Sequence, residues 1–367
     1  MAKALKRVLI GLGVIVLVAV LIVGAYLAYL TITYYRIPDG IDVNVENNPS
    51  VTLKKDTAYT AATFNIGFGA YTPDYTFFMD EGAMADGTKT VGEHSTAASK
   101  ESVEKCTDGA IDILRRLDTD FALLQEVDTD STRSYNVNQK EAVEAAFPGY
   151  SSAFAENYHS GFLAYPLTDM HGIVNGGLLT VGSAHVNSAQ RRSYPVDNGF
   201  IKKFFDLDRC FLVERLPVDG GNELVLINSH MSAFDEGGRI RAQQLEMLCS
   251  MIQKEAVFGN YVIVGGDWNH ALCDSIEMYE SKQLVPPWVA TFSESDLPSG
   301  FTVVRPRNIE EVATCRGVDI PYEKGVTYRV TVDGFIVSDN VIASAENIDA
   351  GFQYSDHNPV KLTFTLK

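Results

Sequence analysis

The sequence predicts an α/β fold in which two packed, mixed β-sheets are flanked by helices, preceded by one N-terminal transmembrane helix. Three observations predict it. Uncharged, mostly apolar residues run without interruption from Val8 to Leu30. Beyond residue 58, short apolar segments typical of strands alternate with turn formers, without a strict strand–helix–strand rhythm. Two segments, 103–117 and 240–256, repeat their apolar residues at the spacing of an amphipathic helix.

The apolar N-terminal segment predicts an uncleaved membrane anchor. At about 1.5 Å per residue it would span roughly 34 Å, enough to cross the hydrocarbon core of a bilayer. Basic residues at positions 3, 6 and 7 precede it and tyrosines lie at its far end, which is typical of a cytoplasmic N-terminus. The alternative is a signal peptide cleaved near the Val-Gly-Ala sequence at 23–25. Both interpretations place the rest of the chain outside the cytoplasm.

The chain divides into three predicted parts. Residues 1–35 form a cytoplasmic stub and the transmembrane anchor, and residues 36–57, rich in turn formers, form a stalk or linker. Residues 58–367 form one folded domain, with strands expected at 59–66, 121–127, 161–166, 176–186, 209–216, 223–230, 261–266, 328–338 and 360–366. Long connections are expected at 67–98, 186–207 and 270–327, and loops of such length often determine specificity.

The charge of the chain argues against a general nucleic-acid-coating role. The formal net charge is −17, and three of the 30 Lys and Arg residues, but no acid, precede Arg36. The remainder therefore holds 27 basic and 47 acidic residues, a formal charge of −20. Such a surface repels polyanions at long range. A nuclease is still compatible with it, because a bound metal supplies positive charge locally.

Missing motifs exclude several other classes. The five cysteines include no CxxC pair, so they do not form a usual zinc site, and their disulfide state stays open. A serine esterase would need a G-x-S-x-G turn and a P-loop enzyme a GxxxxGK[ST] sequence, and neither occurs. The acidic residues Asp128 and Asp130 lack the glycine and terminal Glu of an EF-hand loop.

Polar residues follow or end several apolar strands, where their desolvation is costly unless they find partners. They are Asn65, Glu126, His230, Asp267, Asn269, Asp356 and His357. Each one alone is typical of a turn, a cap or a solvated strand end. Among them, Glu126, Asp267 and Asp356 with Asn65 form an oxygen-rich set, the kind of ligand set that Mg²⁺, or Mn²⁺ in its place, prefers.

Asp333 lies within an apolar strand rather than at its solvated end. Side chains two residues apart share a face of a strand, so Asp333 is expected on the side of Phe335 and Val337. A carboxylate on such a face needs a cationic or donor partner. We expect His357 to be that partner, because an Asp–His pair fixes the imidazole tautomer and stabilises its protonated form.

The ordered series TFNIG, LLQEVD, LINSHMS, VGGDWN, VDGFIVS and YSDHNPV resembles the endonuclease/exonuclease/phosphatase superfamily, the DNase I-like fold, over residues 59–366. With its anchor, the chain looks like a membrane-anchored, bacterial-type member. The resemblance implies a four-layered α/β sandwich and makes residues 58–367 a catalytic domain. It implies a metal site at Asn65, Glu126 and Asp356, with Glu126 as the direct ligand. It implies catalytic roles for His230, Asp267, Asn269, Asp333 and His357.

The expected reaction is metal-dependent attack of water on the phosphorus of a phosphoester, most simply a phosphodiester. The acidic surface and the short tether favour a lipid headgroup or a small phosphodiester as substrate, bound by the 186–207 and 270–327 connections. Candidate contacts there are Trp288, Phe292, Arg191, Arg192, Lys202 and Lys203. An extracellular endonuclease or exonuclease acting on DNA or RNA is the alternative, and a catalytically silent surface-binding protein is the alternative of another class. No protein partner is implied.

Overall fold

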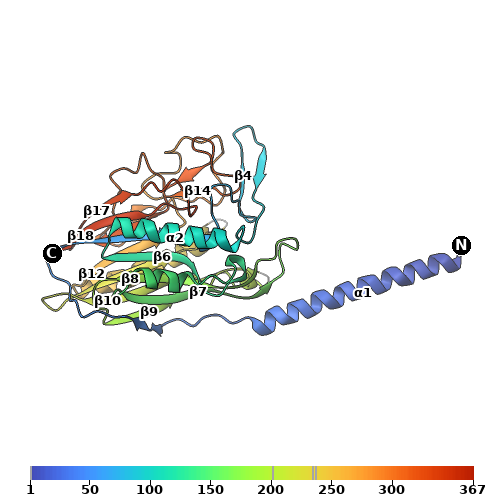
Figure 1. The fold of residues 1–367 in the computed structure, drawn as a ribbon, viewed down its shortest axis with the longest axis horizontal. Helices are drawn as coiled ribbons and strands as arrows, with labels where there is room; N and C mark the ends of the chain where they lie inside the picture. Colours follow the sequence, from blue (N-terminus) through green and yellow to red (C-terminus); the bar gives the residue numbers. More distant parts are fainter. Residues whose placement is uncertain (1, 201, 234, 236–237) are drawn as a thin grey trace.

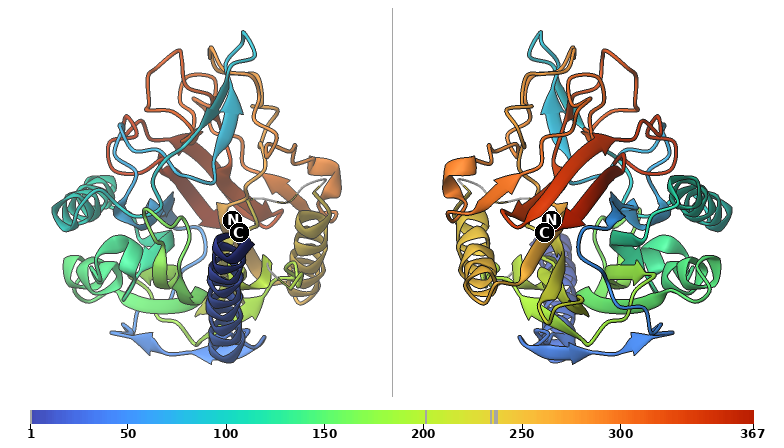
Figure 2. Two further views of the ribbon diagram at one scale, coloured as in Figure 1. Left: turned by 90° about the vertical axis from the view of Figure 1, so that its right-hand side faces the viewer. Right: turned by 90° about the vertical axis from the view of Figure 1, so that its left-hand side faces the viewer.

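A computed structural model describes residues 2–200, 202–233, 235 and 238–367. Two seven-stranded sheets pack face to face, with strand orders β1-β9-β10-β11-β12-β16-β13 and β17-β18-β3-β6-β8-β7-β2. Figure 2 shows α2 and α3 on one flank of the two sheets and α4 on the other. The predicted fold, an α/β sandwich of two mixed sheets flanked by helices, is confirmed.

The first sheet consists of β1 (Ile41–Val43), β9 (Ser188–Ser193), β10 (Cys210–Pro217), β11 (Glu223–His230), β12 (Tyr261–Asp267), β16 (Asp333–Ser338) and β13 (Phe301–Val303). The second consists of β17 (Val341–Asn347), β18 (Val360–Leu366), β3 (Ala58–Asn65), β6 (Phe121–Asp128), β8 (Gly172–Gly182), β7 (Ser151–Leu163) and β2 (Val45–Glu46). Two small hairpins pair β4 (Glu81–Ala83) with β5 (Lys89–Val91), and β14 (Cys315–Arg316) with β15 (Arg329–Val330).

Alternation along each strand divides its side chains between two layers of core. In β11, Leu224 and Leu226 point between the sheets, whereas Val225 and Ile227 pack under α4 (Arg239–Val257). In β3, Ala61 points between the sheets and Phe64 packs under α2 (Lys100–Leu117) and α3 (Gln139–Ala146). Strands of both sheets are therefore buried on both faces, which explains their nearly continuous apolar sequences.

The two predicted helices are confirmed, and their ends have local causes. The side chain of Ser99 caps α2 by accepting a hydrogen bond from the backbone N–H of Ser102. Asp118 ends α2 in a left-handed conformation. The apolar stripe of α2 is buried at Val103, Cys106, Ala110, Ile113 and Leu114. Helix α4 buries Ile240, Leu245, Leu248 and Ile252 and ends at Val257, just before Gly259.

Some predicted strands were wrong. Residues 161–166 were expected to form a strand, but β7 runs from Ser151 to Leu163. Its polar residues, including Asn157 and Ser160, are buried and conceal the strand from a hydrophobicity pattern. The predicted strand 328–338 is divided into β15 and β16, and β9 lies within the predicted connection 186–207.

The segment 36–57, predicted as a stalk or linker, contacts the domain along much of its length. β1 pairs with β9, β2 pairs with β7, and Leu53 is buried in the core between the sheets. The contacts have a physical reason. Short stretches between the turn formers pair with the outer strands of both sheets and supply hydrogen-bond partners to their edges. The segment therefore adds an edge strand to each sheet instead of separating the domain from the N-terminal helix.

Helix α1 (Ala2–Thr33) leaves the domain at the end opposite the C-terminus (Figure 1). The most apolar 18-residue window of Lys3–Thr33 has a mean hydropathy of 3.1 and is not buried in the domain. The helix is long and apolar enough to cross a membrane. A signal sequence has the same properties, so both interpretations of the N-terminal segment fit this helix.

Glu214 is a charged residue in an apolar place. It lies on β10, paired with Ala189 and Leu226 of the inter-sheet core, and is 3% exposed. Within the described part of the chain, no hydrogen bond reaches its carboxylate. Burial raises its pKa to about 8, because the charged form is poorly solvated between the sheets.

Glu214 should make the fold less stable as pH rises. Its pKa rises from an ordinary value of 4.5 to about 8 on folding, so the unfolded chain loses this proton first. The contribution of Glu214 to the free energy of unfolding therefore falls by at most about 1.4 kcal/mol per pH unit between the two pKa values. The free energy of unfolding, measured with urea, should therefore decrease less from pH 5 to pH 8 in Glu214→Gln than in the wild type. Exposed Glu81→Gln is the control, and equal pH dependence in Glu214→Gln would contradict the assignment.

Candidate active site

Strand register brings three of the predicted residues into one row. His230 ends β11 and is paired with Asp267 at the end of the parallel strand β12. Asp267 is in turn paired with Asp333, the first residue of antiparallel β16. Directly paired residues point to the same face of a sheet, so all three side chains face the second sheet. Gly265 and Phe335 form the next pair along the same face.

The second sheet contributes Asn65 and Glu126 to the opposite side of the row. Asn65 ends β3, and its Nδ2 donates to Asp267 Oδ2 at 3.0 Å and to Glu126 Oε1 at 3.3 Å. Its Oδ1 accepts the backbone N–H of Gly67 at 3.0 Å. The amide nitrogen of Asn65, not its oxygen, therefore faces the two carboxylates. In this geometry Asn65 positions Glu126 and Asp267 as a hydrogen-bond donor.

A bulge in β6 aims Glu126 at the site. The pairing of β6 with β8 shifts between Leu124 and Val127, and both of these side chains pack on the α2 side of the sheet. Glu126 lies within the bulge with a φ of +54°, a left-handed conformation uncommon outside glycine. Its carboxylate therefore leaves the strand's alternation and lies 3.9 Å from His230 Nε2.

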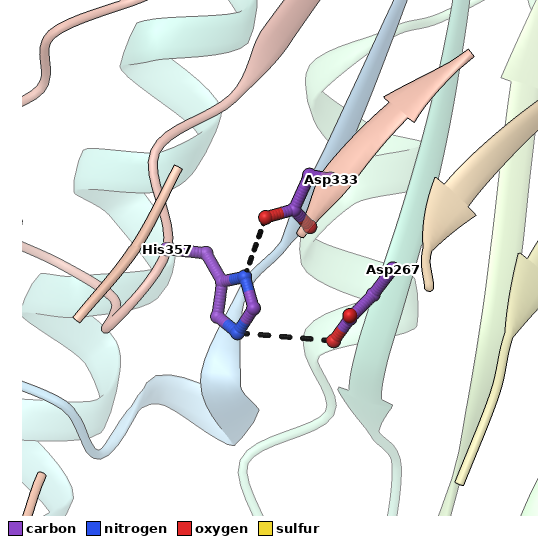
Figure 3. A group of neighbouring side chains, drawn as sticks. All are labelled: Asp267, Asp333 and His357. Carbon is purple, nitrogen blue, oxygen red and sulfur yellow. Dashed lines mark hydrogen bonds and ion pairs between the residues drawn. The ribbon is translucent and has the colours of Figure 1, made fainter. Parts of the chain in front are cut away.

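His357, which precedes β18, lies between two carboxylates of the first sheet (Figure 3). Its Nδ1 is 2.8 Å from Asp333 Oδ2, and its Nε2 is 3.8 Å from Asp267 Oδ2. The backbone N–H of Asp333 donates to Thr314 Oγ1 at 3.0 Å, which fixes the start of β16. The Asp333–His357 contact expected from the sequence is thus present, with the other imidazole nitrogen directed at Asp267.

The two histidines differ in charge. Burial alone would lower the pKa of His357, but the carboxylate of Asp333 and other nearby negative groups raise it well above 6.5. Burial, reinforced by the positive charge of Arg209, lowers the pKa of His230 well below 6.5. At neutral pH the site therefore contains one imidazolium, at His357, and one neutral imidazole, at His230.

Glu126 and Asp356, which the resemblance implies as metal ligands, both line the cavity and could hold a divalent cation. Burial raises the pKa of Glu126; Arg133 opposes this shift and the charge of Asp356 adds to it. Burial likewise raises the pKa of Asp356, opposed by His357 and Arg316. A hard cation would relieve this repulsion, and its preferred ligands are carboxylate oxygens.

A second group of acids and histidine is arranged differently. Ligand atoms of Asp267, Asp333 and His357 lie within 4.8 Å of one another. Nδ1 of His357 is already hydrogen-bonded to Asp333, and its Nε2 is 3.8 Å from Asp267, so one ring nitrogen of this cluster is not free to bind a metal.

Gly67 has a geometric reason to be glycine. Its φ is +53°, and a Cβ there would lie 2.4 Å from a ring carbon of Tyr71 and 3.0 Å from Asp356 Oδ1. The ring of Tyr71 and the carboxylate of Asp356 occupy that space.

A cavity of about 430 Å³ opens above these residues. Among the predicted site residues, its lining includes Glu126, His230, Asp267, Asn269, Asp356 and His357. Asn65 and Asp333 lie outside the lining and contact it through their partners. Asn269 has a left-handed backbone, and its Nδ2 donates to the carbonyl of Met231 at 2.9 Å. The carbonyl of Asn269 accepts from Arg241 Nη1 at 2.8 Å, which holds this turn in place.

Sequence reasoning missed Arg209, which also lines the cavity. It is 5% exposed, and its Nε and Nη1 have no hydrogen-bond partner among the described residues. A buried guanidinium usually finds partners, so these free donors mark a place for an anion. The signal in the sequence was weak: Arg209 opens an ordinary apolar strand, and nothing shows that it points inward.

The predicted substrate contacts are partly wrong. Arg191 binds the backbone carbonyls of Glu156 and Asp208, and Arg192 pairs with Asp39, so both hold the edge of the first sheet. Phe292 is buried against Trp268 in the core under α4. Trp288 and Lys202 do line the cavity.

The disulfide state of the five cysteines, which the sequence left open, is a simple one: all five are free thiols.

Comparison with known proteins identifies the fold. No protein-family model and no curated protein sequence matches the chain. A solved structure of an endonuclease/exonuclease/phosphatase from Beutenbergia cavernae DSM 12333 is similar, with a TM-score of 0.56 and 13% identity over 84% of this chain and 72% of that one. TDP2 from C. elegans has a TM-score of 0.51 and 12% identity over 85% and 76% of the two chains.

A third similar structure is ANGEL2, a 2',3'-cyclic phosphatase, in complex with adenosine-2',3'-vanadate. It has a TM-score of 0.51 and 16% identity, covering 89% of this chain and 99% of that one. The two sheets and their flanking helices are therefore an arrangement that this chain shares with proteins of the endonuclease/exonuclease/phosphatase fold. At these identities the likeness concerns the fold.

Replacing Asp333 by Asn should lower the pKa of His357. In the wild type the pKa of His357 in the folded protein lies above the ordinary value of 6.5. Protonation of His357 therefore stabilises the fold fully below about pH 6.5. This stabilisation is lost as pH rises through the pKa of the folded protein. NMR titration of the imidazole signals, with His357→Asn for assignment, measures the shift. His171, whose pKa burial lowers to about 3, should stay neutral in both proteins. An unchanged pKa of His357 in Asp333→Asn would contradict the pairing.

Proposed function

We propose that the protein is a divalent-metal-dependent hydrolase of phosphoester bonds, most simply phosphodiesters. Residues 58–367 are its catalytic domain, residues 8–30 anchor it in the cell membrane, and the domain lies outside the cytoplasm. The observation that carries the proposal is the set of donors around Asp267. Asn65 from one sheet and His230 from the other approach one carboxylate oxygen at 3.0 and 3.5 Å on the floor of the cavity.

Asp267 is the residue that would orient and deprotonate the attacking water. Its Oδ1 accepts the backbone N–H of Asn269 at 2.9 Å, and its Oδ2 accepts the amide of Asn65. These bonds hold the carboxylate in one orientation, facing the cavity. A fixed carboxylate within reach of a water is the geometry that general-base catalysis requires.

The two histidines would stabilise the charge that develops on the phosphoryl oxygens. His357 is charged because Asp333 holds its Nδ1, so its Nε2 can donate a charge-assisted hydrogen bond. His230 is neutral, and its Nε2 faces the same place between Glu126 and Asp267. Donors that are already aimed at the transition state need little reorganisation during the reaction.

Arg209 would bind a non-bridging oxygen of the same phosphate. Its free Nε and Nη1 are in the cavity wall, near His230, Glu126 and Asp206. Because a guanidinium stays protonated even when buried, it contributes a permanent positive charge. Asn269 would orient the phosphate from the other side, with the Nδ2 proton that Met231 leaves free.

Mg²⁺, or Mn²⁺ in its place, would be held by Glu126 and Asp356, with Asn65 positioning Glu126 through its amide. When bound, the ion would polarise a phosphoryl oxygen of the substrate. Both carboxylates line the cavity, so a phosphate bound by Arg209 would lie close to them. The oxygen-rich set favours a hard cation over Zn²⁺.

The substrate we propose is a lipid headgroup or a small phosphodiester. A formal charge of −20 beyond the anchor disfavours long polyanions. Similarity to a 2',3'-cyclic phosphatase agrees with a compact phosphoester as substrate. An extracellular nuclease would instead nick plasmid DNA, with a rate that falls steeply as salt is raised. A silent binding protein would turn over neither.

Asp267→Asn should lower the turnover of a phosphodiester by at least about 10²-fold with little change in substrate affinity, because the lost group acts in the transition state. The measurement is steady-state hydrolysis of bis(4-nitrophenyl) phosphate, with circular dichroism to verify the fold. Exposed Glu81→Gln is the matched control. A turnover equal to that of the wild type would remove Asp267 from the mechanism.

Removal of divalent ions should abolish the activity. Mg²⁺ or Mn²⁺ should restore it, and Zn²⁺ should restore it poorly because the ligands are oxygens. Glu126→Gln should raise the Mg²⁺ concentration needed for half-maximal rate by about tenfold or more, since a ligand charge is lost. Hydrolysis that continues at full rate in excess chelator would disprove the metal requirement.

A further inference from the structure

The end of β7 is fixed to the apolar part of α1. The hydroxyl of Tyr26 donates to the carbonyl of Phe162 at 3.1 Å and accepts the N–H of Ala164 at 2.8 Å. The hydroxyl of Tyr29 accepts the N–H of Phe162 at 2.9 Å. Both tyrosines belong to the uncharged segment 8–30. Tyrosine is favoured at the boundary of a membrane, so a bilayer that held α1 would place the start of the β7–β8 connection at that boundary.

The same contact joins the anchor to the wall of the catalytic cavity. Leu30 of α1 is 3% exposed and packs with Leu163 and Phe204, with Phe205 against this cluster. Leu163 and Phe205 also line the cavity. One layer of side chains thus separates α1 from the cavity. If α1 spans a bilayer, these contacts, instead of a flexible stalk, set the distance between the cavity and that bilayer.

Apolar side chains are exposed around this junction. They are Tyr165, Leu167, Met170 and Ile173 in and after the β7–β8 connection, and Phe200 beside it. Leu167 is 76% exposed. Lys203 adds a positive charge over the rings of Tyr34, Phe200 and Phe204. We call the residues Tyr165–Ile173 and Phe200 the membrane-facing rim.

Exposed apolar residues elsewhere provide a comparison. Phe258, at the end of α4, is also 76% exposed. It precedes β12, whose first residue Tyr261 bonds the C-terminal Lys367, at the end of the domain opposite α1 (Figure 1). Scattered apolar residues are normal on a surface, but the rim lies against a helix that is uncharged and mostly apolar from Val8 to Leu30.

We infer that the membrane-facing rim inserts into the headgroup layer of the bilayer that holds α1, so that the catalytic cavity opens toward that layer. Burial of exposed Leu and aromatic side chains in the interface stabilises such a contact. The cavity then receives the phosphoester of a membrane amphiphile from the side. The docking of the rim rests on the membrane anchor of the proposed function but not on its catalytic activity, whereas this last statement about substrate rests on both.

Depth-dependent quenching tests the docking directly. The full chain is reconstituted in phosphatidylcholine vesicles with brominated acyl chains, carrying either Leu167→Trp or Phe258→Trp. The unmodified chain gives the background from Trp268 and Trp288. The Leu167→Trp signal should be quenched and the Phe258→Trp signal should not. Equal quenching at both positions, or none at position 167, would overturn the inference, whether the rim faces water, another protein or a second copy of the chain.

A kinetic comparison tests the consequence for substrate. Leu167→Asp should raise the KM for a phospholipid in vesicles by about tenfold, the factor expected for losing one buried leucine side chain. It should leave hydrolysis of soluble bis(4-nitrophenyl) phosphate unchanged, since Leu167 is not in the cavity lining. Phe258→Asp should change neither. Equal effects of Leu167→Asp on both substrates would contradict the docking. If the wild type hydrolyses neither substrate, the proposed function fails, and the quenching result still decides the docking.

Discussion

The site depends on one constraint: the buried carboxylate of Asp267 needs hydrogen-bond donors from both sheets. A buried carboxylate without partners is costly, and neither sheet alone supplies enough donors. One sheet provides the backbone N–H of Asn269 and the approach of His230, and the other provides the amide of Asn65. The two sheets must therefore pack in one relative position at this end of the domain. That position also determines where the other candidate catalytic residues lie.

A polar layer beneath the site helps to fix that register. Gln125 of β6 donates to Asn228 Oδ1 of β11 at 2.7 Å across the inter-sheet space. Asn228 in turn donates to the carbonyl of Leu124 at 3.1 Å. Both side chains are essentially fully buried, so a shift of one sheet against the other would leave several polar groups unpaired. The core on the side of this layer away from the site is apolar and would tolerate sliding far better.

Much of this arrangement could be predicted from the sequence. The face of Asp333 follows from strand alternation, and its contact with His357 follows from the need of a buried carboxylate for a partner. The predictable features share one property: a single polar residue interrupts a regular apolar pattern. The direction of Glu126 could not be predicted, because the β6 bulge reverses the alternation locally. Arg209 and β7 were missed for the opposite reason, since polar residues at a strand start or along a buried strand look like surface.

The contacts of α1 and of the segment that follows it limit how the domain can be oriented relative to that helix. A flexible stalk would allow the cavity to face any direction, whereas β1 and β2 and the contacts of Leu30 tie the domain to the helix. The charge of the domain agrees with the small substrate that we propose. An acidic domain would gain little from long nucleic acids but would be able to bind a single phosphate where Arg209 and His357 concentrate positive charge.

The most direct measurement is the hydrolysis of a simple phosphodiester by the purified full-length protein in ¹⁸O-labelled water with Mg²⁺ or Mn²⁺, followed by mass spectrometry. The account predicts one ¹⁸O atom in the phosphate-containing product and none in the released alcohol, because water attacks phosphorus. Label in the alcohol, or no turnover of any phosphoester with either ion, would contradict the proposed chemistry.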